Sequence, residues 1–425
     1  MSARGCDIAI VGGGLAGGLI ALALAERRPD IAVRVLEASA APGGNHRWSW
    51  FESDLSPEGR ALLESFSITR WDEGYDVRFP AFARTLRTPY RSLASADFAA
   101  ALERLLPAGT IRTGASAAAL DAGGVTLESG ERIIARAVID CRGFAPTPHL
   151  GGGWQVFMGR HLRTPKPHGV SRPVIMDAAV AQVGGYRFVY VLPLGADDLF
   201  VEDTYYQDTP LLDRPALSAR LDAYARAQGW DGEILGSETG VLPVVTGGDF
   251  AALRASQRIE GVAVAGARAG FGHPLTSYTL PFAVQTALAI AAEADLPGGE
   301  LAAMLEMRAR EHWAATRFYR RLGAMLFGAP PERRFRVFER FYRLDEGLIE
   351  RVYAGRSGMA DRLRLLCGKP PVPMGAAVRA FLPGTARWQT PQAANGGGYH
   401  PGSAFAESPL HHPAGGPPPR FGEET

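Results

Sequence analysis

Residues 7–37 read Asp-Ile-Ala-Ile-Val-Gly-Gly-Gly-Leu-Ala-Gly-Gly-Leu-Ile-Ala-Leu-Ala-Leu-Ala-Glu-Arg-Arg-Pro-Asp-Ile-Ala-Val-Arg-Val-Leu-Glu. The first five, 7–11, form an apolar run suited to a buried parallel strand, and a glycine-rich turn follows directly. Residues 15–28 favour a helix, which Pro29 would end, and the apolar run 32–36 suits a second strand. The order strand, glycine turn, helix and strand predicts the first unit of a Rossmann-like α/β sheet.

The glycine turn fits the pattern G-x-G-x-x-G, in which each glycine has a physical purpose. Gly12 permits the tight turn, Gly14 lets a pyrophosphate approach the backbone, and Gly17 lets the helix pack closely on the strand. The helix N-terminus offers N–H donors to phosphates, and Glu37 has the offset that suits ribose hydroxyls. We predict a dinucleotide site here, with a purely structural glycine turn as the alternative. Its residues are Gly12, Gly13, Gly14, Leu15, Ala16, Gly17 and Glu37.

The residues that follow Glu37 favour FAD over NAD. Ala38-Ser39 comes next and then Pro42-Gly43-Gly44, a sequence that resembles flavoproteins of the glutathione-reductase type. Two later apolar strands, at 137–141 and 261–265, also close on glycine turns, and such strands return the chain to the cofactor in two-dinucleotide-fold flavoproteins. The predicted FAD contacts from these turns are Arg142, Gly143 and Gly266.

Composition and charge narrow the class of protein. The chain has 425 residues, enough for two domains and a tail, and 45 Lys and Arg against 44 Asp and Glu give no general attraction for nucleic acid. Cys6, Cys141 and Cys367 are too widely spaced for a disulfide framework or a zinc site, so we expect buried free thiols, no metal and a cytoplasmic location. The uncharged stretches 8–25 and 269–292 contain glycines or prolines, and we expect neither to span a membrane.

The rest of the chain divides by composition. Residues 45–100 are aromatic without a regular pattern, and we expect them to be irregular. A hairpin is predicted at 125–135, and three β-rich runs within 173–206 predict an antiparallel meander. Helices are predicted near 214–228 and 280–292. The predicted divisions are a Rossmann-like FAD-binding domain (1–150 and about 255–295), an antiparallel-sheet substrate domain (151–254), a helical C-terminal region (296–382) and a disordered Pro/Gly-rich tail (383–425).

The helical region is both aromatic and basic. Through 333–343 aromatic residues recur at helical spacing with arginines on the other side, and residues 305–369 hold 15 Lys or Arg against 8 Asp or Glu. A basic amphipathic surface of this kind suits an anionic membrane face. The alternative is an aromatic core with a solvated arginine face.

Two adjacent carboxyl residues, Glu202 and Asp203, lie in the predicted strand 199–206. Adjacent strand residues face opposite sides, so only one of the two points into a pocket with Phe200 and Thr204, and by parity it is Glu202. Apolar surroundings raise the pKa of a carboxyl group, which can then donate a proton near neutral pH. The alternative is that Glu202 is an ordinary surface residue.

Eight short motifs, in this order, resemble the bacterial members of the lycopene cyclase family. The likeness runs from about residue 5 to about residue 378. The motifs are Gly-Gly-Asn-His-Arg-Trp-Ser-Trp (43–50), Asp-Cys-Arg-Gly (140–143), Pro-His-Gly (167–169), Ile-Met-Asp (175–177), Gly-Tyr-Arg-Phe-Val-Tyr (185–190), Val-Glu-Asp-Thr-Tyr-Tyr (201–206), Arg-Ala-Gly-Phe-Gly-His-Pro (268–274) and Asp-Arg-Leu-Arg-Leu-Leu-Cys-Gly-Lys-Pro-Pro-Val-Pro (361–373).

The resemblance implies a proton-initiated, non-redox cyclisation of both acyclic ends of lycopene, through γ-carotene to β-carotene. It implies FAD in the reduced form, with NAD(P)H as reductant, and a location in the cytoplasm at the inner face of the cell membrane. The family's acidic motif falls on residues 201–204, so the implied proton donor is Glu202, with Asp203 as a supporting group and Asp177 as a weaker candidate for orienting the acid.

Two segments depart from the related patterns. Residues 276–278 read Thr-Ser-Tyr, where we expect two threonines and a glycine, so contacts there stay open. Related flavin hydroxylases have an acid after a glycine like Gly266, whereas this chain has Ala267 and then Arg268. The missing acid argues against an ordinary flavin monooxygenase.

Two other functions share the predicted fold. A flavin-dependent oxidoreductase, either a hydroxylase or a desaturase of an apolar isoprenoid, would change the oxygen or hydrogen count of its product. A non-enzymatic carotenoid-binding or membrane-associated flavoprotein would use Glu202 only structurally. The sequence does not indicate an oligomeric state.

Overall fold

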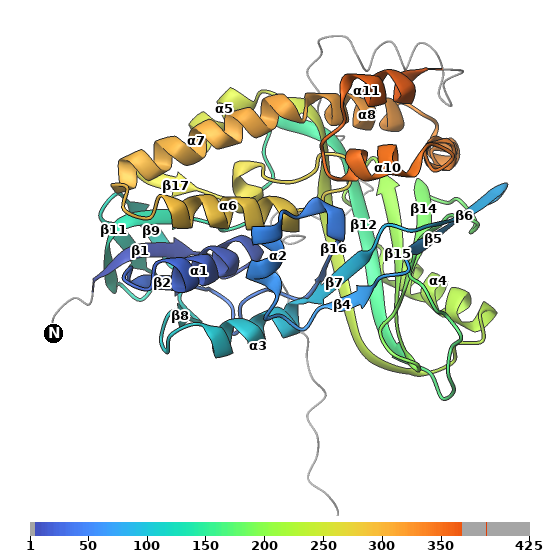
Figure 1. The fold of residues 1–425 in the computed structure, drawn as a ribbon, viewed down its shortest axis with the longest axis horizontal. Helices are drawn as coiled ribbons and strands as arrows, with labels where there is room; N and C mark the ends of the chain where they lie inside the picture. The colour runs from blue at the N-terminus through green and yellow to red at the C-terminus, as the bar shows by residue number, and fades with distance from the viewer. Residues whose placement is uncertain (1–4, 368–387, 389–425) are drawn as a thin grey trace, which may run out of the picture.

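The computed structural model describes residues 5–367 and residue 388, and its core is built on two large sheets that lie side by side (Figure 1). The unit predicted at 7–37 forms as expected. β1 (Cys6–Val11) leads into α1 (Leu15–Arg27), and the chain returns as β2 (Val33–Leu36), parallel to β1. On its other side β1 pairs in parallel with β11 (Arg132–Asp140).

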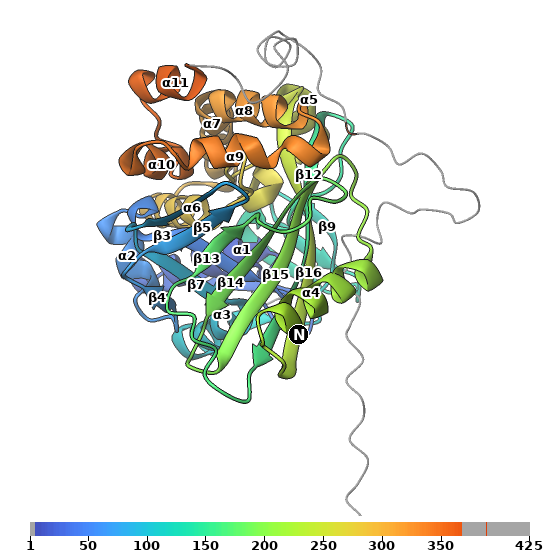
Figure 2. The same cartoon turned by 90° about the vertical axis from the view of Figure 1, so that its right-hand side faces the viewer.

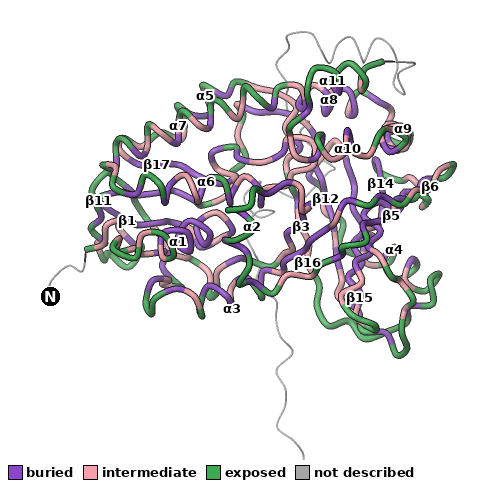
Figure 3. The backbone as a smooth tube through the Cα atoms, in the orientation of Figure 1, coloured by how far each residue is buried: buried purple, intermediate pink, exposed green. Residues whose placement is uncertain are grey.

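The first sheet is Rossmann-like at its centre and antiparallel at one edge. β17 pairs in parallel with β11, and the predicted hairpin forms between β10 and β11. The remaining strands are β8 (Ile111–Arg112), β9 (Ala117–Asp121), β10 (Gly124–Leu127) and β17 (Val262–Val264). Helix α6 (Leu280–Ala292), which has the predicted bounds, packs against α1 over this sheet, and Figure 3 shows both helices and the central strands largely buried.

The second sheet contains the predicted meander. Its strand order is β16-β12-β15-β14-β13-β5-β6, in which β14 is antiparallel to both β13 and β15, while β13 is parallel to β5. Its longest strands, β12 and β16, were not among the predicted runs. The strands are β5 (Tyr75–Phe79), β6 (Phe82–Leu86), β12 (Leu150–Arg163), β13 (Val174–Asp177), β14 (Tyr186–Pro193), β15 (Asp198–Gln207) and β16 (Glu233–Gly248). The predicted helix α4 (Arg214–Ala227) packs against one face, on β15 and β12.

The expectation that residues 45–100 are irregular is wrong. This segment forms a small antiparallel sheet and short helices, and it adds β5 and β6 to the second sheet, where β5 pairs with β13. β7 shows no alternation because it is buried along almost its whole length, whereas β5 alternates buried and more open residues, a strand pattern that the sequence does contain. The other elements are β3 (Arg47–Phe51), η1 (Glu52–Asp54), α2 (Pro57–Leu63), β4 (Thr69–Trp71), β7 (Tyr90–Ala94) and α3 (Ser95–Leu105).

The C-terminal region is helical, as predicted, and it caps one end of the second sheet (Figure 2). Along the chain, α5 (Phe250–Gln257) and η2 (Gly266–Ala269) follow β16 and precede the C-terminal helices. The first of these helices, α7 (Gly298–Ala315), packs on β17 and β11 of the first sheet. The cap elements are α8 (Arg317–Phe327), η3 (Pro331–Arg333), α9 (Phe335–Phe341), α10 (Glu346–Tyr353) and α11 (Met359–Leu366).

One arginine of the predicted basic face is not solvated. Arg334 is 1 % exposed, and its guanidinium donates to the carbonyl O of Tyr206 at 3.1 Å and to Asp208 Oδ1 at 2.7 Å. Arg334 therefore fixes the start of α9 to the end of β15. The predicted disordered tail lies outside the described residues except for Trp388, whose Nε1 donates to the carbonyl O of Thr147 at 3.0 Å.

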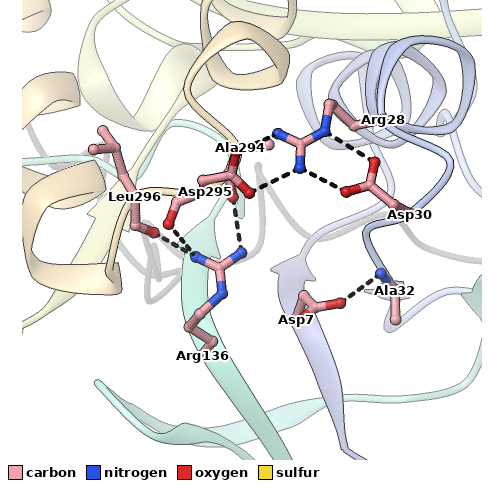
Figure 4. Close-up of polar contacts among 8 residues, drawn as sticks. All are labelled: Asp7, Arg28, Asp30, Ala32, Arg136, Ala294, Asp295 and Leu296. Atoms are coloured by element: carbon pink, nitrogen blue, oxygen red, sulfur yellow. Dashed lines mark hydrogen bonds and ion pairs between the residues drawn. The ribbon is translucent and has the colours of Figure 1, made fainter.

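A cluster of charged residues fastens the end of the first sheet that lies away from the glycine turn (Figure 4). Arg28, just after α1, bonds to Asp30 and reaches Asp295, which follows α6, at 2.8 Å. Arg136 of β11 donates to the carbonyl O of Ala294 at 2.8 Å. These contacts join both covering helices to the sheet, so the glycine turn at the opposite end starts from a fixed base.

Three expectations drawn from composition concern the cysteines, the membrane spans and the metal ligands. Cys141 is buried as expected, but Cys6 is only half-buried and Cys367 is exposed, so the expectation of three buried thiols is wrong for those two. Within residues 5–367, no helix is long and apolar enough to cross a membrane. No group of His, Cys, Asp and Glu side chains in the same part of the chain has the arrangement of a metal site.

Candidate active site

The glycine turn has the close packing that its sequence predicts. Gly12 has a φ of 101°, and a Cβ there would lie 2.8 Å from the carbonyl O of Cys141. A Cβ on Gly17 would overlap the carbonyl O of Gly12, so both positions need glycine. Gly14 caps the N-terminus of α1, and nothing lies within 4 Å of where its Cβ would be. Within the described residues, no side chain caps the first N–H groups of α1.

Glu37 is held at the same turn. Its Oε2 accepts a hydrogen bond from the Gly13 backbone N–H at 2.6 Å, and its Oε1 accepts one from the Ser39 N–H at 2.7 Å. A carboxylate has about four lone-pair sites, so the two oxygens can still accept bonds from hydroxyl groups. The position at the end of β2, beside the turn, is the one that the Rossmann pattern assigns to a ribose-binding acid.

The other predicted cofactor residues lie around this turn. Gly143, just after β11, has a φ of 73°, and Gly266, just after β17, has a φ of 63°. A Cβ on Gly266 would lie 2.7 Å from the Cβ of Ala16 in the first turn of α1. The structure thus brings the ends of β1, β11 and β17 together at one edge of the sheet, where ligands of such folds bind.

The buried carboxylate of Asp140, which the sequence analysis did not identify as a site residue, forms two ion pairs at this edge. Asp140 is 1 % exposed and pairs with the Arg142 guanidinium and with Arg268 Nε, each at 2.8 Å. Arg268 lies two residues after Gly266, in the turn that lacks the hydroxylases' acid, and its side chain points back to Asp140. The motif Asp-Cys-Arg-Gly contained the signal, because a carboxylate two residues from an arginine at a strand end can form such a pair.

The residues present at this edge fit FAD. Free N–H groups at the start of α1 and the open space at Gly14 suit a pyrophosphate, and Glu37 suits a ribose. The assignment of Gly12, Gly13, Gly14, Leu15, Ala16, Gly17, Glu37, Arg142, Gly143 and Gly266 as FAD contacts stays a prediction.

A short segment leads from the glycine turn to the second sheet. The Gly43 N–H donates to the carbonyl O of Gly13 at 3.0 Å, and the Asn45 side chain donates to the carbonyl O of Ser237 on β16 at 3.1 Å. Two residues on, the Arg47 guanidinium lies over the Phe200 ring of β15, 5.5 Å from its centroid. This segment therefore connects the glycine turn with the part of the second sheet that carries Glu202, the predicted acid.

Glu202 faces this segment, as its parity with Phe200 and Thr204 predicts. Its side chain is buried, and the Thr204 hydroxyl donates to Glu202 Oε1 at 2.7 Å. Burial is the main effect on this carboxyl and raises its pKa, while the Thr204 bond opposes the rise. The prediction of a buried carboxyl with a raised pKa is confirmed, and its use as a proton donor stays a prediction.

Asp203 points to the opposite face of β15, under α4. Its carboxylate accepts hydrogen bonds from Arg187 Nε at 2.8 Å and from the Tyr205 hydroxyl at 2.7 Å. Asp177 lies beneath the same helix, where it accepts a bond from the Tyr224 hydroxyl at 2.9 Å. The structure therefore does not bring Asp203 or Asp177 to the side of the sheet that carries Glu202.

Hydroxyl-bearing rings surround Glu202 on its own face. Tyr190 lies directly opposite Glu202 on β14, and the Tyr278 hydroxyl lies 3.3 Å from that of Tyr190 and 3.0 Å from that of Tyr90. Burial raises the pKa of each of these three tyrosines, so they stay neutral. Tyr278 belongs to the loop that departs from the expected pattern, and these hydroxyl contacts are what the loop contributes.

An apolar pocket lies beyond these tyrosines, among the C-terminal helices. It is bounded by α8, α9, α10 and α11 and by the loop before α6. Tyr353 lines it, and the Tyr353 ring lies 6.1 Å from that of Tyr278. Its apolar lining includes Leu275, Leu326, Phe338, Phe341 and Leu365. The sequence analysis did not identify this pocket, because its walls come from helices whose packing is non-local.

The arrangement defines a class of protein. A geranylgeranyl bacteriochlorophyll reductase-like protein from Thermoplasma acidophilum superposes on this chain with a TM-score of 0.55 at 13 % identity. The superposition covers 85 % of this chain and 96 % of that one. PqsL of Pseudomonas aeruginosa, titled a probable FAD-dependent monooxygenase, superposes with a TM-score of 0.52 at 16 % identity, over 80 % and 100 %. The fold is therefore that of the FAD-binding reductases and monooxygenases.

The sequence comparisons place the chain within that class. The family described as lycopene cyclase protein matches residues 7–379. A lycopene β-cyclase of a Paracoccus species is 45 % identical over 88 % of this chain and 97 % of that one, and one of Pseudescherichia vulneris is 44 % identical over 88 % and 97 %. The chain belongs to the lycopene cyclase family.

Proposed function

We propose that this protein is a lycopene β-cyclase, which converts both acyclic ends of lycopene to β-ionone rings through γ-carotene to β-carotene. The observation that supports this proposal most directly is Glu202, a buried carboxyl with a raised pKa on a face lined by aromatic rings. Membership of the lycopene cyclase family supports the same activity.

The chemistry needs one proton in and one proton out for each ring. The neutral carboxyl of Glu202 donates a proton to the terminal double bond of lycopene, and the resulting tertiary carbocation is attacked by the neighbouring double bond. Loss of a proton beside the new ring carbon restores a double bond. The mass of the product equals that of the substrate, so no electrons are gained or lost.

The residues around Glu202 suit such a cation. Aromatic faces attract cations, and the rings of Tyr90, Tyr190 and Tyr278 lie on the same side of the sheet as Glu202. Apolar surroundings exclude water, which would otherwise capture the cation as an alcohol. FAD bound at the glycine turn and reduced by NAD(P)H would supply a negative charge, and that charge would stabilise the cation.

The second sheet and the helical region would form the substrate side of the molecule. We propose that lycopene enters from the inner face of the cell membrane through the apolar pocket. Helix α11 beside that pocket exposes Met359, Leu363 and Leu366, by 71 %, 60 % and 42 % respectively. These positions lie on one face of the helix, and the exposed Arg364 lies on the same helix, so the surface suits an anionic membrane.

The first test is anaerobic incubation of the protein with lycopene in liposomes, with oxidised FAD in one sample and chemically reduced FAD in the other. Products are read by chromatography and mass. Conversion to β-carotene of unchanged mass with reduced FAD alone is expected. A product whose mass has shifted in an aerobic NAD(P)H sample would instead show the flavin-dependent oxidoreductase.

The role of Glu202 is tested by Glu202→Gln, which keeps the size of the side chain but cannot donate the proton. Turnover should fall by 10²-fold or more, about the range of general acid catalysis, while lycopene still binds. Ser218→Ala, a small change under α4 on the far face of the sheet, is the control and should keep its turnover. Full activity of the Glu202→Gln variant would remove Glu202 from the mechanism.

A further inference from the structure

A second carboxyl residue lies in the same row of the sheet as Glu202. Gly159 of β12 is paired with Glu202 of β15 on one side and with Glu238 of β16 on the other. Directly paired residues of antiparallel strands point to the same face, so the two glutamates share a face and are separated by a single strand. At the usual strand spacing their Cα atoms are about 10 Å apart, which two glutamate side chains can bridge.

The residue between them has no side chain of its own, and the Phe200 ring lies over it. A Cβ on Gly159 would overlap the ring of Phe200 and would lie 3.2 Å from Glu238 Cγ. The Glu238 side chain therefore lies on the same face as Glu202, beside the Phe200 ring that covers Gly159. The row Glu238, Gly159, Glu202 and Tyr190 crosses the sheet without a bulge, because the register shifts of β12 lie at its ends, at 151–152 and 161–162.

One cation serves both carboxyl groups. Arg47 attracts Glu202 and Glu238, and a hydrogen bond from its backbone also reaches Glu238. Burial raises the pKa of Glu238, and the nearby Glu202 raises it further. Arg47 also attracts the exposed Asp97, so its one positive charge does not balance both carboxylates of the pair. This balance favours one proton shared between Glu202 and Glu238 over the neutral pH range.

The other titratable groups that face the pair leave this balance in place. Burial lowers the pKa of His161, so its ring is neutral over the neutral pH range. The nearby tyrosines are neutral, and Asp203 is paired with Arg187 on the opposite face of the sheet. The facing groups, taken over every element packed against the pair, are Arg47 of β3, Tyr90 of β7, His161 of β12, Tyr190 of β14 and Tyr278 of the loop before α6.

We propose that Glu202 and Glu238 act as one acid–base pair, in which Glu202 delivers the proton that starts each ring closure and Glu238 accepts the proton that ends it. This inference rests on the proposed cyclase function. Glu202 loses its proton to the terminal alkene carbon, a carbon–carbon bond closes the ring, and the adjacent C–H bond breaks with its proton passing to Glu238. Transfer of that proton from Glu238 to Glu202 resets the pair for the second ring, so atoms and electrons balance within the substrate and the two carboxyl groups.

The test is the pH dependence of kcat with reduced FAD and lycopene in liposomes, for the unaltered protein, Glu238→Gln and Glu238→Asp. The unaltered protein should lose activity at low pH, where both carboxyl groups of the pair are protonated, and at high pH, where both are ionised. Glu238→Gln should reduce kcat by about 10²-fold, remove the acidic limb and shift the alkaline limb to lower pH, because the like charge that raises the pKa of Glu202 is gone. Glu238→Asp should keep both limbs.

The matched control is Glu233→Gln, an exposed glutamate on the same strand, which should leave the profile unchanged. A Glu238→Gln variant with both limbs at the pH values of the unaltered protein would overturn the inference.

Infrared titration of the carboxyl C=O band gives a second measurement, which needs neither turnover nor substrate. Removing either partner should let the other ionise at a lower pH, so Glu202→Gln and Glu238→Gln should each lower the pH at which the remaining band disappears. Bands that titrate at unchanged pH would overturn the pair even if a variant is inactive. Failure of the unaltered protein to convert lycopene would overturn the proposed function and leave the infrared test of the pair intact.

Discussion

Glu202 and Asp203 are adjacent in the sequence and have the same chemistry, yet their surroundings differ completely. Asp203 is paired with Arg187 and Tyr205, which hold its charge in place beneath α4. Glu202 accepts one bond from a hydroxyl and lies among aromatic rings, with Arg47 as a shared and more distant cation. The alternation of side chains along a strand therefore separates a structural carboxylate from the proposed proton donor within one residue.

Asp54 offers a prediction at the scale of a single residue. Its side chain is 6 % exposed, Oδ2 accepts a hydrogen bond from the Phe51 N–H at 3.0 Å, and Oδ1 has no partner within the described residues. Burial raises the pKa of Asp54 to about 7. Because the pKa is higher in the folded than in the unfolded state, its contribution to stability is complete at low pH and is lost as the pH rises toward 7.

Asp54→Asn keeps the acceptor oxygen and cannot ionise. Relative to the unaltered protein, its free energy of unfolding should therefore increase between pH 4 and pH 8 by on the order of 4 kcal/mol at most. Denaturant unfolding at several pH values measures this difference. The exposed Asp197→Asn serves as the control, and parallel pH profiles for the unaltered protein and Asp54→Asn would contradict the expectation.

At the scale of the element, the turn between β1 and α1 makes the next prediction. Gly17→Ala places a Cβ onto the carbonyl O of Gly12, so the turn must open and α1 must move. We expect FAD to bind at least ten-fold more weakly and the fold to lose about 1–3 kcal/mol. Flavin absorbance per protein after gel filtration, together with thermal unfolding, measures both effects.

Gly299→Ala is the matched control for this turn, because Gly299 also lies in the first turn of a helix and nothing surrounds its Cβ position. It should leave FAD binding unchanged and stabilise the fold by at most about 1 kcal/mol. Equal flavin content in the two variants would show that the close approach at Gly17 is unimportant for the cofactor.

At the scale of the whole molecule, the exposed apolar face of α11 would bring the pocket to a membrane. Replacing both Met359 and Leu363 by Glu removes apolar area and adds negative charge, so binding to vesicles of anionic phospholipid should fall at least ten-fold. Co-sedimentation with the vesicles measures binding, and turnover of lycopene in detergent should not change.

Leu211→Glu changes an equally exposed leucine before α4, away from the cap, and is the control for that experiment. Its vesicle binding should match that of the unaltered protein. An equal loss of binding in the two variants would point to net charge rather than to the face of α11.

The sequence by itself determined the local elements. Local patterns within about 30 residues specify these elements: an apolar run, a glycine turn and a stretch of helix-forming residues. For this reason β1, α1 and β2 form as predicted, and α6 has the predicted bounds. Strand parity likewise assigned Glu202 and Asp203 to opposite faces without knowledge of any partner strand. Such features depend only on residues that are adjacent along the chain, so the sequence alone predicts them.

Only the tertiary structure decided which strands and side chains meet. β5 joins β13 from a segment about 100 residues earlier, and the row Glu238, Gly159 and Glu202 exists because β12 pairs with β15 and β16 in one particular register. A shift of one residue would turn every side chain of a strand to the other face, and that register is set by packing between distant segments. The burial of Arg334 and the apolar pocket have the same origin, since both depend on how helices and sheet close together.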